Sequence, residues 1–184
     1  MLDLSEFESI SPYTDEEAAE ALNKLAEFPL LSKISQQFFP EETPDFLQNL
    51  LRSINTIDDF QVLVMQKFVR WALENTSTGF TYEGIDNIRT DRKFLAMSNH
   101  RDIILDPAIT QLVLHMNNIP LTEIAVGDNL ITNKTIEYLI RSNRMIKVVR
   151  GISARELYLS SQLLSRYIRL NITEQRSSIW LAQR

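Results

Sequence analysis

The chain has 184 residues, a formal net charge of −5, 44% hydrophobic and 23% charged residues, and no cysteine. These values are ordinary for a folded globular protein, and they exclude disulfides, thiolate catalysis and cysteine-bound zinc or iron–sulfur sites. The two histidines are far apart in the sequence, so a histidine-rich metal site is not expected and the sequence predicts no metal.

Charge is distributed unevenly along the chain. Residues 1–90 carry a net charge of −10, whereas residues 134–184 carry a net charge of +7. Such asymmetry predicts either an anionic partner for the C-terminal part, such as phosphate, anionic lipid or nucleic acid, or compensation between the two parts. Aromatic residues suited to base stacking are sparse among these bases, so we do not expect a nucleic-acid partner.

Neither a membrane-spanning segment nor a signal peptide is visible. No apolar run approaches the roughly 20 residues that a spanning helix needs, and the acidic start of the chain lacks a basic region followed by an apolar one. The absence of cysteine fits a reducing compartment. We therefore expect a cytoplasmic protein, or one attached peripherally to the inner face of a membrane.

Residues 1–76 are predicted to form a helical N-terminal region. Thr14 begins a capping-box-like sequence for a helix that runs to about residue 28, and Thr43-Pro44 is typical of a helix cap followed by proline at the first helical position. Thr56 is expected to cap the strongest helix of this region, to about residue 74. Its wide apolar surface favours burial against the following domain, and a membrane-interface helix is the alternative.

Residues 77–184 are predicted to form an α/β domain, after a polar break at 75–79. A short strand at 80–83 should precede strands that alternate with helices. The expected strands are 93–97, 123–126, 145–149 and 178–182, and the expected helices are 107–117, 135–142 and 154–170. This alternation predicts a mainly parallel or mixed sheet with flanking helices. Because the chain stops on its last strand, we expect the domain to be incomplete at its C-terminus.

His100 is the residue that the sequence singles out for chemistry. It follows an apolar strand directly, at the carboxyl end where α/β folds usually keep their sites. A neutral imidazole can take a proton from a hydroxyl when a carboxylate fixes its tautomer, and Asp102 and Asp106 are both candidates. Asp106 also fits a purely structural role, because aspartate followed by proline is typical of a helix N-cap. Asn99 and Arg101 flank the histidine, and either could contact substrate or satisfy loop backbone.

The pair Asn99-His100 followed by Asp106 resembles the first motif of the glycerolipid acyltransferases, the superfamily of glycerol-phosphate and lysophosphatidic acid acyltransferases. Three other segments match this superfamily in the same order. Residues 82–88 are similar to the lead-in before the first motif, and residues 125–130 are similar to the segment after the second strand. Residues 145–150 are similar to the second motif, an apolar strand that ends in arginine. Together they cover roughly residues 80–184.

The resemblance implies transfer of a fatty acyl group from acyl-CoA or acyl carrier protein to a hydroxyl of glycerol 3-phosphate, 1-acylglycerol 3-phosphate or a related lipid precursor. It makes His100 the general base and Asp106 the residue that orients its imidazole. It also implies that Asn99, Arg101 and Arg150 contact the substrate, with Arg150 on the acceptor phosphate. Direct attack on the thioester needs no cofactor and no metal. The lipid substrate implies contact with the inner membrane surface. A non-catalytic module of the same fold that binds lipid or acyl carrier is the alternative.

The sequence departs from the family pattern at three points. Five residues separate His100 from Asp106 where four are usual, so Asp102 is also open as the partner of the histidine. Gly127 stands where a lysine is common. The third motif, a Glu-Gly pair followed by a basic residue, is absent, since the chain ends at Arg184 where this motif is expected to begin. We therefore predict weak or no activity for this chain in isolation.

Overall fold

The structure, a computed structural model, describes residues 4–150 and 153–183. The chain divides into two compact units, each of which draws on separate stretches of the sequence. The α/β unit comprises residues 1–12, 81–131 and 145–184, and the helical unit comprises residues 13–80 and 132–144. Among the described residues, no helix is both long enough and apolar enough to cross a bilayer.

The α/β unit is built on a parallel sheet, which confirms the predicted fold class. Its strands are β1 (Leu95–Asn99), β2 (Glu123–Gly127), β3 (Met145–Val148) and β4 (Ile179–Gln183). They pair in the order β1-β4-β2-β3, and each pair is parallel. All four strands therefore end at the same edge of the sheet, and the residues that follow them lie at that edge.

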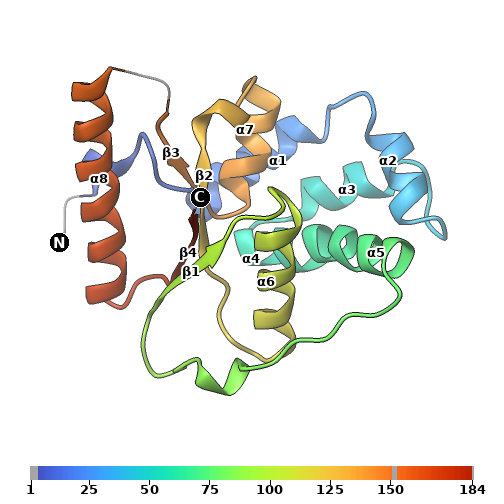
Figure 1. The fold of residues 1–184 in the computed structure, drawn as a ribbon. Helices are drawn as coiled ribbons and strands as arrows, with labels where there is room; N and C mark the ends of the chain where they lie inside the picture. The colour runs from blue at the N-terminus through green and yellow to red at the C-terminus, as the bar shows by residue number, and fades with distance from the viewer. Residues whose placement is uncertain (1–3, 151–152, 184) are drawn as a thin grey trace. The chain divides into compact units, whose positions relative to one another are not determined.

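Helices cover both faces of this sheet. The helix α6 (Leu105–Met116) and the helix α8 (Ala154–Thr173) lie on opposite faces (Figure 1). Tyr167 of α8 packs in a buried cluster with Ile146 and Ile179 of the sheet. Phe7, from the short η1 turn (Ser5–Phe7), meets the Tyr167 ring edge to face at 5.3 Å between centroids. The backbone N–H of Lys147 donates to the Ile10 carbonyl at 2.9 Å, so the start of the chain lies against β3.

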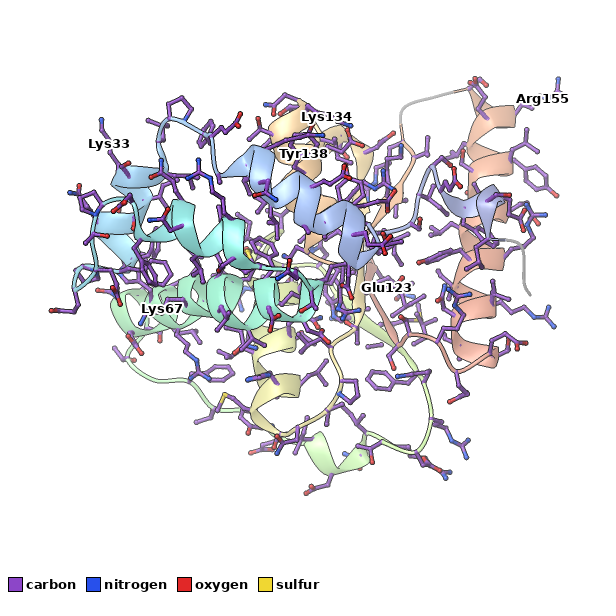
Figure 2. The ribbon with its side chains drawn as sticks, turned by 180° about the vertical axis from the view of Figure 1, so that it is seen from behind. Lys33, Lys67, Glu123, Lys134, Tyr138 and Arg155 are labelled. Atoms are coloured by element: carbon purple, nitrogen blue, oxygen red, sulfur yellow. The ribbon has the colours of Figure 1, made fainter. Side chains whose placement is uncertain are left out.

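Tyr167 also ties α8 to the start of β2. Its phenol donates a 2.7 Å hydrogen bond to the Glu123 carboxylate, and both side chains are buried (Glu123 is labelled in Figure 2). Burial, together with the charge of Glu123, raises the pKa of Tyr167 far above its ordinary value, so the phenol keeps its proton and donates.

Replacing Tyr167 with phenylalanine is expected to lower the free energy of unfolding by about 1–3 kcal/mol, because it leaves a buried carboxylate without this donor. Urea unfolding measures the change. Tyr158 of α8 is 63% exposed, so Tyr158→Phe is the matched control and should leave the midpoint unchanged. Equal midpoints for all three proteins would show that the hydrogen bond contributes nothing to stability.

Two expectations for the α/β unit are wrong. Residues 80–83 form no strand, because the short alternating run has no neighbouring strand to pair with. Gly84 instead adopts a left-handed φ of 78° and leads into the short turn η3 (Ile85–Asn87). The first strand of the sheet is not buried either, since β1 lies at an edge and Met97 is 54% exposed. The remaining strands and helices lie within a few residues of their predicted positions.

The helical unit packs its helices around one apolar core. They are α1 (Asp15–Leu25), α2 (Leu31–Phe38), α3 (Phe46–Ser53), α4 (Ile57–Asp59), the π-helical segment η2 (Phe60–Met65), α5 (Gln66–Thr76) and α7 (Lys134–Ser142). Leu22, Leu47 and Phe60 are at most 1% exposed in this core. The long helix from α4 to α5 thus buries its apolar face within the helical unit. On α7, Lys134 lies over the Tyr138 ring at 5.3 Å (Figure 2).

The predicted helix caps have mixed outcomes. Thr14 forms a complete capping box with Glu17, and Thr56 accepts from the backbone N–H of Asp59, as predicted. The prediction for Thr43-Pro44 is wrong, because α3 begins two residues later, at Phe46. The helix α2 was not predicted, and no side chain caps its first turn.

Candidate active site

The loop after β1 is organised around one carboxylate. Oδ2 of Asp106 accepts hydrogen bonds from the backbone N–H groups of Arg101, at 2.7 Å, and Asp102, at 2.8 Å. Nδ1 of His100 lies 3.4 Å from the same oxygen. The side chains of His100 and Asp106 are 26% and 23% exposed. A single carboxylate oxygen therefore holds the loop backbone and faces the imidazole of His100.

Asp102 has a different role, at the start of α6. Its Oδ1 accepts from the backbone N–H groups of Ile104, at 2.8 Å, and Leu105, at 2.7 Å. These amides have no partner inside the helix, so Asp102 satisfies them. The alternative in which Asp106 is the N-cap of a helix that starts at residue 107 is wrong, because α6 begins at Leu105. The structure brings His100 to Asp106 despite the extra residue between them.

Hydrogen bonds from the backbone keep both carboxylates ionised. The pKa of Asp106 lies below its ordinary value, chiefly because of the Asp102 N–H, while the Arg101 N–H and His100 add to the effect and partial burial opposes it. The N–H groups of Leu105 and Ile104 lower the pKa of Asp102 in the same way. An ionised Asp106 beside Nδ1 favours the tautomer with a proton on Nδ1, which leaves Nε2 free to accept one.

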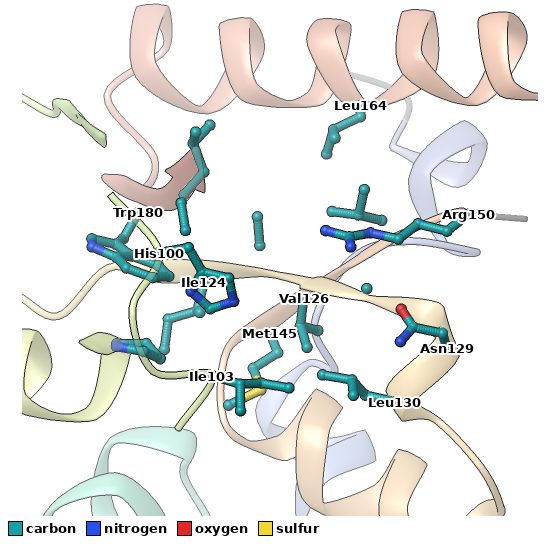
Figure 3. Close-up of a pocket in the computed structure, with 16 residues that line it drawn as sticks. His100, Ile103, Ile124, Val126, Asn129, Leu130, Met145, Arg150, Leu164 and Trp180 are labelled. Atoms are coloured by element: carbon teal, nitrogen blue, oxygen red, sulfur yellow. The ribbon is translucent and has the colours of Figure 1, made fainter. Parts of the chain in front are cut away.

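A cavity of about 220 Å³ lies where the sheet opens at its carboxyl edge. β4 pairs with β1 along five residues, but with β2 at only two, Glu123↔Ile179 and Ile124↔Trp180. Beyond these pairs, residues 125–127 of β2 and 181–182 of β4 line the cavity, and the paired Trp180 lines it as well (Figure 3). The other lining residues are His100, Ile103, Pro107, Ile124, Asn129, Leu130, Met145, Val148, Arg150 and Leu164.

Arg150 reaches this cavity from the end of β3. Its backbone N–H donates a 3.0 Å hydrogen bond to Oδ1 of Asp128, in the short turn η4 (Asp128–Leu130) that follows β2. A Cβ atom on Gly127 would lie 2.4 Å from Oδ1 of Asn129 and 3.0 Å from Nε of Arg150. The missing side chain at position 127 therefore leaves the space that the Asn129 and Arg150 side chains occupy. A side chain at position 127, such as the lysine of the family pattern, would require the Asn129 and Arg150 side chains to shift.

The structure brings together three of the five predicted site residues. His100 and Arg150 line the same cavity and enter it from different sides, and Asp106 contacts His100 (Figure 3). Asn99 and Arg101 are exposed and do not line the cavity in the described part of the chain. Arg101 contributes its backbone N–H to Asp106 instead.

Asn129 lines the cavity but was not predicted as a site residue. It lies in residues 125–130, the segment that is similar to the family's segment after the second strand. This similarity was the only sign in the sequence that Asn129 belongs to the site.

Comparison with known proteins agrees with this geometry. Residues 79–182 match the family model described as Acyltransferase. No curated protein and no solved structure matches the chain significantly. The matched residues include β1, the His100 loop, Asp106, Arg150 and most of β4. They also make up more than half of the chain, so it belongs to the glycerolipid acyltransferase family and has a general acyltransferase function.

Proposed function

We propose that the chain transfers a fatty acyl group from acyl-CoA or acyl carrier protein to a hydroxyl of glycerol 3-phosphate, 1-acylglycerol 3-phosphate or a related lipid precursor. One observation carries the proposal: His100 lies 3.4 Å from the Asp106 carboxylate and lines a cavity that Arg150 also lines. A base and a cation thus face the same space, as transfer to a phosphorylated alcohol requires.

In this proposal His100 is the general base. Its Nε2 takes the proton of the acceptor hydroxyl while the oxygen attacks the thioester carbonyl. The carbon–sulfur bond then breaks, and the departing thiolate takes the proton from the imidazolium. Asp106 keeps Nδ1 protonated and stabilises the positive charge during the transfer. The step consumes no oxidant or reductant, and the acyl donor is a substrate, so no cofactor is proposed.

Arg150 is proposed to hold the acceptor phosphate. A guanidinium can donate two parallel hydrogen bonds to phosphate oxygens, and Asn129 lies beside it over Gly127. Asn99 and Arg101 are exposed next to His100, and we propose that they contact parts of the substrate outside the cavity. Because the fatty acyl group and the acylated product are lipids, the proposed place of reaction is the inner membrane surface, reached from the cytoplasm.

Replacing Arg150 with alanine is expected to raise KM for glycerol 3-phosphate by about 10- to 100-fold, because a charge-assisted hydrogen-bond pair is lost. The effect on kcat should be much smaller. Thiol release from palmitoyl-CoA measures both constants. Arg155, on the first turn of α8, does not line the cavity, so Arg155→Ala is the matched control.

Equal KM values for Arg150→Ala and Arg155→Ala would contradict the proposal that Arg150 binds the acceptor phosphate. Binding of palmitoyl-CoA and glycerol 3-phosphate without any thiol release would contradict the proposed reaction and favour a non-catalytic binding module.

A further inference from the structure

The first turns of α8 extend past the sheet. α8 has 20 residues and is about 30 Å long, whereas a strand of five residues spans about 17 Å. The C-terminal part of α8 packs against the sheet, where Tyr167 and Asn171 are 6% and 3% exposed. The overhang therefore falls on the N-terminal turns, which follow the carboxyl end of β3 (Figure 1). Leu157, Tyr158 and Leu159 are 46%, 63% and 55% exposed there.

One face of α8 runs from the packed part into this overhang. Intervals of three and four residues place the following side chains on that face: Leu157, Ser160, Leu164, Tyr167 and Asn171. Tyr167 and Asn171, at the C-terminal end of this face, are buried. Leu164 lines the cavity, and Ser160 is half-buried. Leu157 thus continues the cavity-lining face outward, whereas Leu159 is on the opposite face of the helix.

The cavity is too small to enclose a lipid substrate by itself. Its volume of about 220 Å³ lies below the roughly 300–1,000 Å³ that is usual for small-molecule sites. Ile124, Met145 and Leu164 make much of its wall apolar, while Arg150 supplies a cation. A ligand with an anionic group at Arg150 and a long apolar chain therefore extends beyond the cavity. The α8 face continues from the lining at Leu164 past the half-buried Ser160 to the exposed apolar side chain of Leu157.

We propose that Leu157, Ser160 and Leu164 form a track for the unbranched acyl chain of a substrate, an inference that rests on the proposed function. The acyl chain leaves the cavity at Leu164 and follows α8 for two turns, about 10 Å, to Leu157. Methylene groups that cover Leu157 are removed from water, so the track favours long acyl chains over short ones. The acyl chain belongs either to the donor or to an acylated acceptor.

The test compares kcat/KM of the full chain for palmitoyl-CoA and butyryl-CoA, with glycerol 3-phosphate as the acceptor. Leu157→Ser is expected to lower the palmitoyl-to-butyryl ratio by about five- to tenfold, and Leu157→Met should preserve it. Leu159→Ser is the matched control, because it removes a similarly exposed leucine from the opposite face.

A second arm of the experiment distinguishes the two sources of the acyl chain. It compares 1-acylglycerol 3-phosphate with glycerol 3-phosphate, with butyryl-CoA as the donor. If Leu157→Ser lowers the preference for the long-chain substrate in the first arm alone, the track holds the acyl chain of the donor. If it lowers this preference in the second arm alone, the track holds the acyl chain of the acceptor.

Unchanged ratios in both arms for Leu157→Ser overturn the track. An equal loss in Leu159→Ser also overturns it, and indicates that the overhang is a surface for a membrane or for a second copy of the chain. Failure of the proposed function looks different, since then no acyl-CoA is turned over at all. In that case the calorimetric affinity for palmitoyl-CoA is compared between Leu157→Ser and Leu159→Ser, and absence of any binding overturns the track as well.

Discussion

Replacing His100 with alanine is expected to lower kcat for acyl transfer by about 10²- to 10⁴-fold, the usual contribution of a positioned general base. In the proposed mechanism the acceptor hydroxyl then has no base among the described residues that line the cavity, while the proposed phosphate site at Arg150 is kept. KM for glycerol 3-phosphate should therefore change little. Thiol release from palmitoyl-CoA at saturating acceptor concentration measures the effect.

The chain provides its own control for this result. His115, the other histidine, lies in the last turn of α6 and does not line the cavity, so His115→Gln should keep kcat within about twofold of the wild-type value. If His100→Ala retained wild-type kcat with an unchanged circular dichroism spectrum, His100 would not be the base, and the proposed mechanism would be wrong.

The second large effect is expected at Asp106. Asp106→Ala leaves the Arg101 and Asp102 N–H groups without their acceptor and frees the imidazole, so we expect kcat to fall by about 10²-fold or more. Asp106→Asn keeps an oxygen for the loop but removes the charge, so it should restore much of the stability and little of the kcat. Asp102→Asn, which alters the start of α6, should lower kcat less than either.

The same carboxylate makes a prediction for acid unfolding. The pKa of Asp106 in the folded state lies below its ordinary value of 3.8, so the folded protein binds fewer protons than the unfolded chain between these two values. The contribution of Asp106 to stability is therefore complete above this window and is lost as the pH falls through the folded-state pKa.

Urea unfolding at a series of pH values measures that loss. The Asp106→Asn variant should lack this part of the pH dependence, and Asp102→Asn should lack the separate part that arises from the lowered pKa of Asp102. A variant curve parallel to that of the wild-type protein would show that Asp106 does not contribute.

The sequence was sufficient to predict the residues that end up at the carboxyl edge of the sheet. His100 follows an apolar strand directly, the resemblance to the family's second motif points to Arg150, and parallel strands bring such ends to one edge of the sheet. Spacing alone left both Asp102 and Asp106 open as the partner of His100, and only the resemblance to the family favoured Asp106. The two carboxylates differ in the backbone N–H groups that donate to them. Asp102 accepts hydrogen bonds from N–H groups at the start of α6, whereas Asp106 accepts them from N–H groups of the loop.

Other features depend on contacts that no local pattern encodes. The opening of the sheet follows from the pairing of β4, which has five residue pairs with β1 and two with β2. The proximity of Asn129 and Arg150 depends on space that becomes visible only when β2 and β3 lie side by side. The alternating run at 80–83 has the local pattern of a strand. It forms none, because a strand requires a neighbouring strand to pair with, and this run has none.

The limited pairing between β2 and β4 divides the sheet into two ribbons. The ribbon of β1 and β4 carries His100, and the ribbon of β2 and β3 carries Arg150. Two residue pairs at the amino ends of β2 and β4 join the two ribbons. They are Glu123↔Ile179 and Ile124↔Trp180. A substitution that changes the packing at these two pairs is therefore expected to change the separation of His100 and Arg150 without altering either side chain.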